Sequence, residues 1–96
     1  MEKNWVVYIL QCKDDTLYTG STDHLERRLQ MHRSGKGAKY TRGRGPLTLR
    51  YVESCENRGQ ALRREYAIKN LTRQEKLELC AGFAEKETVE IQPTVY

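Results

Sequence analysis

Two short runs of β-branched and aromatic residues, Trp5–Gln11 and Leu17–Thr22, lie on either side of the polar segment Lys13-Asp14-Asp15-Thr16. Runs of this composition favour extended strands, and a short aspartate-containing segment between them is typical of a hairpin turn. A hairpin alone cannot bury its apolar face, so the rest of the chain must supply elements that cover it. The hairpin therefore limits the available folds more than any other feature.

The next part of the chain indicates a helix followed by a third strand. Asp23-x-x-Glu26 matches a capping box, in which two side chains bind the first free amides of a helix. The helix should run to about Arg33 and end before Gly35, because glycine readily adopts the conformation that terminates helices. Residues 47–55 again carry β-branched and aromatic side chains, so we expect a strand there.

Two further capping signals follow. Asn57-x-x-Gln60 and Thr72-x-x-Glu75 predict helices over about 58–71 and 73–81, and Gly82 should end the second helix. The order β-β-α-β-α-α predicts an α+β fold, a three-stranded antiparallel sheet flanked by helices. Because 96 residues do not suffice for two cores, we expect one domain over residues 4–82. Residues 83–96 would form a C-terminal tail that is frayed or adds a short strand.

Composition excludes several classes of protein. No apolar run approaches the roughly 18 residues needed to cross a bilayer, so we expect no membrane association. The apolar run near the N-terminus is too short for a signal peptide. The three cysteines are far apart and lack metal-site spacing, so we expect reduced thiols in a cytoplasmic protein.

Positive charge is concentrated in one segment. Residues 27–50 contain eight cations and no acid, whereas the rest of the chain carries a net charge of −4. A basic block in an otherwise acidic domain is typical of a surface that binds a polyanion, and its glycines would let backbone amides approach phosphates. The alternative is a solvated loop that is merely basic. The candidate nucleic-acid contacts are Lys36, Lys39, Arg42 and Arg44.

The first expected helix carries two polar side chains beside its apolar stripe. With about 100° per residue, Arg28 and His32 fall along one edge of the stripe formed by Leu25 and Leu29. Each alone is unremarkable, since an arginine can extend its head to solvent and a histidine can be satisfied by one hydrogen bond. Together, beside two strand tyrosines, they form a plausible pair for binding a phosphate and handling a proton.

The second expected helix carries a carboxylate in the middle of its apolar face. On the helical wheel Glu65 falls midway between Ile68 and Leu62, close to Ala61. A buried, unpaired carboxylate is costly, so it needs a partner. Lys69, one turn later, can supply an ion pair; the alternative is a divalent cation shared with a substrate phosphate. The wheel does not decide between these two.

The turn length decides whether Tyr8 and Tyr18 can share a site. A two-residue turn at Asp14-Asp15 places the two phenols on opposite faces of the hairpin, because side chains alternate. A three-residue turn from Lys13 to Asp15 instead sets Tyr8 opposite Gly20 and brings both phenols to one face. A shared site therefore predicts an odd-length turn or a bulge.

These residues resemble the GIY-YIG endonuclease superfamily over residues 4–80, in particular a small single-domain bacterial branch. That branch has the same Ser34-Gly35-Lys36-Gly37-Ala38 loop and the same Leu62-Arg63-Arg64-Glu65-Tyr66 helix. The resemblance implies the three-stranded fold already expected. The motifs that carry it are, in order, Val7-Tyr8-Ile9, Tyr18-Thr19-Gly20, Arg28, His32 and Glu65.

The resemblance also implies roles. Glu65 would hold a single Mg²⁺ or Mn²⁺ against the scissile phosphate, and Arg28 would stabilise the developing charge. One of Tyr8 and Tyr18 would orient or deprotonate the attacking water, with His32 assisting. Because a free phenol has a pKa near 10, the metal and nearby cations would have to lower it.

The chain departs from the family pattern at three points. Val6-Val7-Tyr8 stands where Gly-Ile-Tyr names the family, and Thr19 replaces the middle isoleucine, but both tyrosines remain. Gly20, which would allow close backbone approach, also remains. Relatives that cut chosen targets carry a recognition domain for which this chain has no room, so we expect a protein partner to supply specificity.

Three functions are therefore open. The first is a metal-dependent DNA endonuclease, structure-selective or weakly sequence-selective, of the kind used in DNA repair or recombination. The second is a nucleic-acid-binding module that cuts little without a partner. The third is a structural domain whose tyrosines and glutamate are merely packed, although packing alone would favour an apolar residue at position 65.

Overall fold

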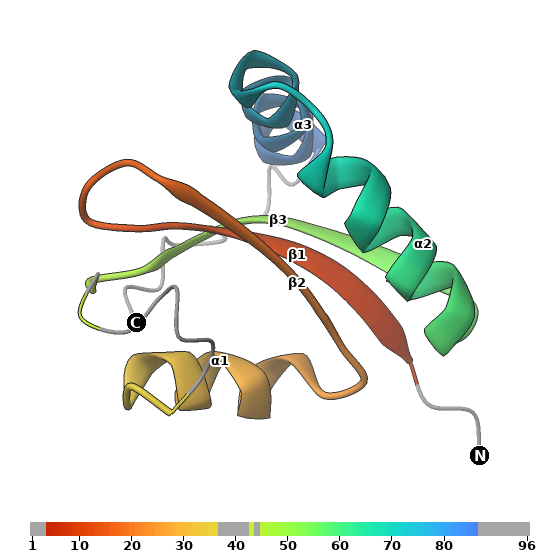
Figure 1. The fold of residues 1–96 in the computed structure, drawn as a ribbon, viewed down its shortest axis with the longest axis horizontal. Coiled ribbons are helices and arrows are strands. Elements are labelled where there is room, and N and C mark those ends of the chain that lie inside the picture. Colours follow the sequence, from red (N-terminus) through yellow and green to blue (C-terminus); the bar gives the residue numbers. More distant parts are fainter. Residues whose placement is uncertain (1–3, 37–42, 44, 87–96) are drawn as a thin grey trace.

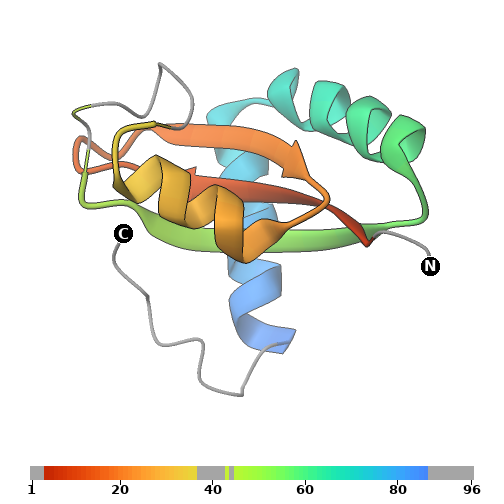
Figure 2. The same cartoon turned by 90° about the horizontal axis from the view of Figure 1, so that it is seen from below.

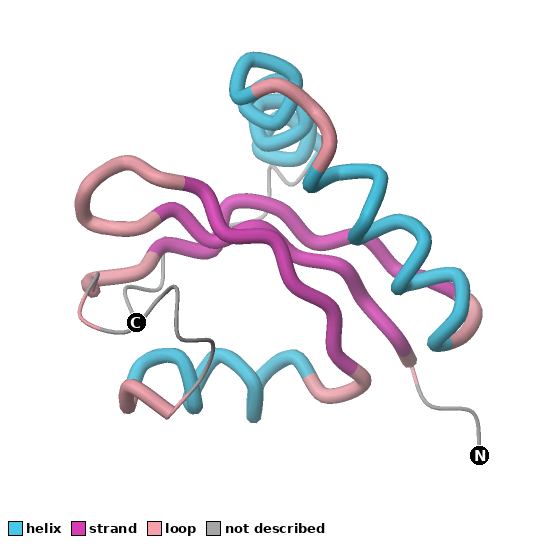
Figure 3. Tube along the Cα trace, in the orientation of Figure 1, coloured by secondary structure: helices cyan, strands magenta, loops and turns pink. Residues whose placement is uncertain are grey.

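The computed structural model describes residues 4–36, 43 and 45–86 and confirms the expected order of elements. Its sheet contains β1 (Trp5–Gln11), β2 (Leu17–Thr22) and β3 (Thr48–Cys55), in the spatial order β2-β1-β3 with both pairs antiparallel. The helices are α1 (Leu25–Arg33), α2 (Arg58–Lys69) and α3 (Arg73–Lys86). Figure 3 shows the three strands side by side in a twisted sheet. The fold is therefore α+β, with a three-stranded antiparallel sheet flanked by helices.

The helices cover both faces of the sheet. Helix α1 lies against one face, and α2 and α3 lie against the other (Figure 1 and Figure 2). Because side chains alternate along a strand, the central strand β1 contributes to both layers. Its residues Tyr8 and Leu10 belong to the core on the α1 side, whereas Val7 and Ile9 belong to the core beneath α2 and α3. This alternation decides which layer each functional side chain enters.

The hairpin between β1 and β2 has the odd-length turn that a shared tyrosine site requires. Tyr8 lies opposite Gly20, and Leu10 lies opposite Tyr18. The amide of Cys12 donates to the carbonyl oxygen of Thr16 at 2.8 Å, which leaves a three-residue loop. Asp15 closes that loop in the left-handed conformation, with φ of 67°. The predicted register is confirmed.

Helix α1 begins one residue later than the capping box predicted. Its N-cap is His24, whose Nδ1 accepts a hydrogen bond from the amide of Arg27 at 3.3 Å. The amide of His24 in turn donates to Oγ1 of Thr22 at 3.1 Å, which fixes the entry to the helix. The Asp23 prediction was wrong because an imidazole nitrogen can replace the cap oxygen. The predicted end is confirmed, since Gly35 follows the helix with φ of 79°.

The caps of α2 and α3 are confirmed, but the predicted end of α3 was wrong. The amide of Gln60 donates to Oδ1 of Asn57 at 2.8 Å, and Thr72 and Glu75 cap each other's amides at 2.9 and 3.1 Å. Helix α3 nevertheless continues past Gly82 to Lys86. Phe83 packs edge-on against Tyr51 of β3, with ring centroids 5.8 Å apart. This tertiary contact outweighs the weak helix propensity of glycine.

Cys12, Cys55 and Cys80 are free thiols, as predicted. Within residues 4–36, 43 and 45–86, no helix has the length and apolar character needed to cross a bilayer.

Candidate active site

Tyr8 lies at the centre of a cluster of polar side chains between the sheet and α1. The residue is fully buried, and its hydroxyl lies 2.8 Å from Nε2 of His32, which is 2% exposed. Tyr18 packs beside both, with ring centroids 6.4 Å from Tyr8 and 5.3 Å from His32. Tyr18 is half-buried, so its side chain is the more accessible of the two tyrosines.

Arg28 joins this cluster from α1, one turn before His32. Its guanidinium hydrogen-bonds to the hydroxyls of Tyr8 and Tyr18. Burial lowers the pKa of Arg28, but the interactions with the two tyrosines outweigh burial and leave the pKa raised. The guanidinium is therefore a fixed positive charge held by two phenols.

Burial disfavours the charged forms of Tyr8 and His32. It raises the pKa of the tyrosine and lowers that of the histidine, so both side chains remain neutral. Burial raises the pKa of Tyr8 to about 12, although the hydrogen bond from Arg28 acts to lower it. Burial, and then the charge of Arg28, lower the pKa of His32 to about 4. Arg28 acts on Tyr8 in the direction expected of a nearby cation, but desolvation outweighs it and the pKa stays above its ordinary value.

These protonation states assign the direction of the buried hydrogen bonds. Arg28 can only donate, so it donates to the oxygen of Tyr8. The hydroxyl proton of Tyr8 is then directed at Nε2 of neutral His32. In this arrangement Nε2 accepts, and the imidazole carries its proton on Nδ1.

Glu65 approaches the same edge of the sheet from the opposite layer. Strand β2 is an edge strand, and Ser21 on it donates a hydrogen bond from Oγ to Oε1 of Glu65. The charge of Glu65 contributes to the raised pKa of Tyr8, so the two groups influence each other electrostatically around the edge of β2. Tyr8, Tyr18, Arg28 and His32 therefore form one contact cluster, and Glu65 flanks it.

The second oxygen of Glu65 forms an ion pair with Lys69, which is one of the two alternatives that the sequence left open. Nζ of Lys69 lies 2.6 Å from Oε2, and the side chain of Glu65 is only 17% exposed. Among the described residues no three His, Cys, Asp or Glu side chains cluster as metal ligands. Glu65 fits a hard cation that is bound through one carboxylate plus a substrate phosphate, because its Oε2 already holds a cationic group.

The basic segment is described only at its start. Lys36 is exposed just beyond α1, and its amide closes the helix by donating to the carbonyl oxygen of Met31 at 2.8 Å. Lys39, Arg42 and Arg44 lie outside the described residues. Their predicted contacts with nucleic acid therefore stay predictions.

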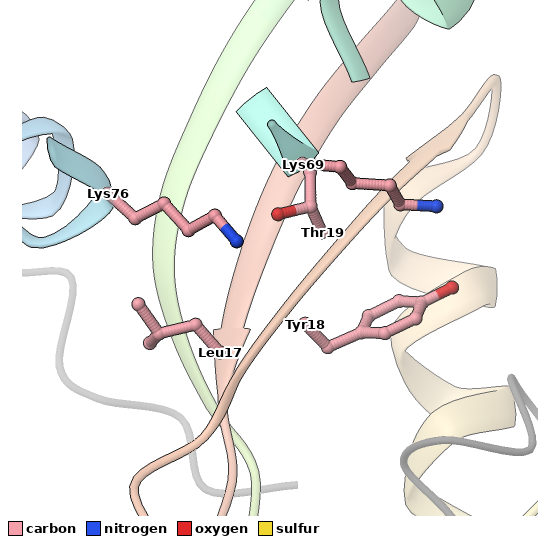
Figure 4. A pocket seen from close by; sticks show the side chains of 5 residues that line it. All are labelled: Leu17, Tyr18, Thr19, Lys69 and Lys76. Carbon is pink, nitrogen blue, oxygen red and sulfur yellow. The ribbon is translucent and has the colours of Figure 1, made fainter. Parts of the chain in front are cut away.

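Sequence reasoning missed two features of this region. Ser21 was not identified as a partner of Glu65, although its position opposite Val7 places it on the α2 side of the sheet. A hollow beside β2 was also missed; its described lining residues are Leu17, Tyr18, Thr19, Lys69 and Lys76 (Figure 4). The alternation of side chains along β2 predicts on which face Ser21 lies, whereas the hollow depends on how α2 and α3 are placed.

Known proteins resemble this chain over most of its length. A family model of the GIY-YIG catalytic domain matches residues 4–78. A UPF0213 protein of Oceanobacillus iheyensis is 57% identical over 79 residues, covering 82% of this chain and 92% of the relative. A UPF0213 protein of Clostridium perfringens is 57% identical over 81 residues, covering 84% and 87%.

Two solved structures are also similar. The solution structure of a UPF0213 protein from Bacillus halodurans is 44% identical, with a TM-score of 0.57, covering 95% of this chain and 99% of that one. The solution structure of a protein from E. faecalis is 42% identical, with a TM-score of 0.61, covering 88% and 93%.

Proposed function

Because this chain belongs to the family of GIY-YIG catalytic domains, we propose that it is a metal-dependent nuclease that hydrolyses phosphodiester bonds of DNA. Its action would depend on DNA structure or only weakly on sequence. One observation carries the proposal: a fixed guanidinium, two phenols, a neutral imidazole and a carboxylate meet at the edge strand β2. A purely structural domain has no need for this set of groups around one edge.

Arg28 would stabilise the transition state. Attack on a phosphodiester concentrates negative charge on the phosphoryl oxygens, and a positive charge already held in place costs no reorganisation. The hydroxyls of Tyr8 and Tyr18 hold the guanidinium, which is half-buried and therefore open to a substrate on one side. Loss of either hydroxyl would leave Arg28 less well oriented.

The two tyrosines would divide their work by accessibility. Tyr18 is half-buried, so its hydroxyl is in a position to orient an attacking water. Tyr8 is fully buried and directs its proton at His32, so it acts as a positioning residue behind Arg28. Neutral His32 would assist by accepting the hydrogen bond from the Tyr8 hydroxyl, which fixes the orientation of that group.

Glu65 would hold the divalent cation that GIY-YIG nucleases generally use, Mg²⁺ or Mn²⁺ here. Such an ion supplies Lewis-acid polarisation of the phosphate and lowers the pKa of a bound water. The chain's contribution is orientation, because Ser21 fixes Oε1 and leaves Oε2 to a cation. Lys69 occupies that position in the structure and would have to move aside.

The partner would be DNA, with the basic segment after α1 binding its phosphates. Lys36, Lys39, Arg42 and Arg44 are the proposed contacts, and a protein partner would add specificity. The free thiols of the three cysteines are compatible with a cytoplasmic location.

A second function is favoured by the Lys69 pairing. An ammonium group occupies Oε2 of Glu65, so it has to be displaced before a divalent cation can bind there. A nucleic-acid-binding module that becomes active only with a partner would have this arrangement.

The discriminating experiment is a nicking assay on supercoiled plasmid, branched DNA and RNA of matched sequence. We expect cleavage of DNA with Mg²⁺ or Mn²⁺ and none with EDTA. Binding without cleavage under every condition would favour the second function, and cleavage that is unaffected by EDTA would overturn the metal-dependent one.

A further inference from the structure

A hollow of about 430 Å³ lies against the α2 and α3 side of β2. Leu17 and Thr19 of β2 line it, together with Lys69 of α2 and Lys76 of α3. Figure 4 shows the Lys76 side chain extending toward Leu17 and Thr19, and the Lys69 side chain extending toward the Tyr18 side. Tyr18 also lines it, so the hollow adjoins the cluster of Tyr8 and Arg28. Its volume lies in the range of roughly 300–1,000 Å³ that is typical of small-ligand sites.

Thr19 carries an unpaired hydroxyl in this hollow. The residue is 3% exposed, and its Oγ1 has no hydrogen-bond partner among the described residues. A buried hydroxyl without a partner is destabilising, and valine would fill the same volume without that penalty. Figure 4 shows the Thr19 hydroxyl directed toward the Lys76 side chain rather than into the apolar core. The hydroxyl itself is buried at the wall of the hollow, so a ligand reaches it once the flexible Lys76 side chain moves aside.

The ammonium group of Lys76 faces this hydroxyl, whereas that of Lys69 is directed toward the Tyr18 side (Figure 4), where it pairs with Glu65. Lys76 comes from the first turns of α3, and within the described part of the chain no carboxylate pairs with it. Lys69 is 49% exposed and shares its charge with Glu65, so it can turn toward the hollow without leaving the region. The described lining residues of the hollow thus offer hydrogen-bond donors and positive charge, and no carboxylate is among them.

We infer that the hollow formed by Thr19, Lys69 and Lys76 binds a backbone phosphate of the nucleic-acid strand, next to the phosphate that is cut. The inference rests on the proposed nuclease function, which places the scissile phosphate at Arg28. Ammonium groups bind phosphate oxygens as point charges, and a hydroxyl can donate a short hydrogen bond to a phosphate oxygen. Because Tyr18 lines both sites, one strand along the edge of β2 can occupy both. The second phosphate would fix the direction of the strand.

The test follows the amide and methyl NMR signals of Thr19 in EDTA at constant ionic strength. The probes are a short single-stranded oligothymidine, whose phosphates are diesters, and inorganic phosphate. We expect a saturable shift of the Thr19 signals with the oligonucleotide and a much weaker one with inorganic phosphate. A stronger response to inorganic phosphate would overturn the inference in favour of a site for small phosphates, and no response to either probe would overturn it altogether.

Variants separate specific from general electrostatic effects. Lys76→Gln should weaken oligonucleotide binding about tenfold, as expected for one charge-assisted hydrogen bond. Lys13→Gln removes the same charge from the exposed β1–β2 loop and should weaken it by no more than about twofold. Lys69 is left unchanged in these variants because it also contacts Glu65. Equal losses in the two variants would overturn the inference.

Thr19→Val guards against a trivial loss of folding. It should weaken binding severalfold while raising the melting temperature, because the unpaired hydroxyl is removed. A purely structural Thr19 would not move affinity and stability in opposite directions, and unchanged affinity would overturn its role. If DNA is not cleaved but the Lys76-dependent response persists, the phosphate site stands and the nuclease proposal fails. If DNA is cleaved but Lys76→Gln loses no more affinity than Lys13→Gln, the nuclease proposal stands and the phosphate site fails.

Discussion

The phenol of Tyr8 occupies the space that a side chain at Gly20 would need. A Cβ built at position 20 would lie 2.6 Å from the Tyr8 hydroxyl oxygen and 3.0 Å from the ring of Tyr18. Tyr8 is fully buried, so its ring has no room to retreat. The glycine of the Tyr18-Thr19-Gly20 motif is therefore required by packing against Tyr8, independently of any contact with a substrate.

Gly20→Ala should displace the two phenols that hold Arg28. We expect a loss of about 1–3 kcal/mol in the free energy of unfolding, typical of overpacking, and a large loss of cleavage. Urea unfolding and the nicking assay measure the two effects. Gly82→Ala is the matched control, because no atom lies within 4 Å of a Cβ there and the change should stabilise α3 by about 0.5–1 kcal/mol. Wild-type stability and activity in Gly20→Ala would contradict this packing.

The buried His32 should make the protein less stable in mild acid. Its pKa is about 4 in the folded state, against an ordinary value of 6.5, so between these values only the unfolded chain takes up a proton. Stability should therefore fall as the pH drops from 6.5 to 4, by up to about 3 kcal/mol from this residue.

Unfolding free energies measured across that pH range test the effect. His32→Gln keeps an acceptor for Tyr8 but does not titrate, so its profile should be flatter than that of the wild type. His24→Asn, which removes an exposed histidine and keeps an N-cap, should not flatten the profile. The assignment fails if His24→Asn flattens it and His32→Gln does not.

Lys69 should compete with a divalent cation for Glu65. Removing the ammonium group that lies 2.6 Å from Oε2 leaves that oxygen free. We expect Lys69→Gln to raise the affinity for Mn²⁺ about tenfold, the size of one close charge interaction in a partly exposed site. Calorimetric titration without DNA measures this directly, with Lys13→Gln as the control. Weaker or unchanged Mn²⁺ binding in Lys69→Gln would argue against a cation site at Glu65.

The basic segment should contribute affinity without sequence preference. Replacing Lys36, Lys39, Arg42 and Arg44 by serine should weaken binding similarly for all DNA sequences. The slope of log affinity against log salt should flatten by about 0.9 for each of these residues that contacts a phosphate of duplex DNA. Fluorescence anisotropy over a salt series gives the slope, and an unchanged slope would identify the segment as a solvated loop.

The sequence was sufficient where local chemistry decides the structure. The caps at Asn57 and Thr72 depend on neighbouring residues and were predicted correctly. The turn after Cys12 was left open between two and three residues, and only a shared site for Tyr8 and Tyr18 favoured the three-residue turn that is present. Gly82 failed as a helix end because Phe83 gains a contact with β3 that no local pattern contains. Local signals thus fixed the elements, whereas tertiary contacts adjusted where they end.

The site was predictable in its members but not in its electrostatics. Helix phase identified Arg28, His32 and Glu65 as polar side chains on buried faces. It did not reveal that Tyr8 is fully buried, which raises the pKa of its phenol. Tyr18 is therefore the more accessible of the two tyrosines. Burial depends on all three layers of the fold, so a helical wheel cannot give it. The hollow at Thr19 was missed for the same reason.

Arg28 and Glu65 are proposed to act on one scissile phosphate. The most direct measurement is the initial rate of plasmid nicking in Mn²⁺ by Arg28→Ala and Glu65→Gln, with Arg27→Ala and Glu56→Gln as exposed controls of the same charge change. We predict that the first two lose at least about a hundredfold in rate, the loss typical of removing a key charge-stabilising group, while the controls keep theirs. Equal rates in all four variants would contradict the account.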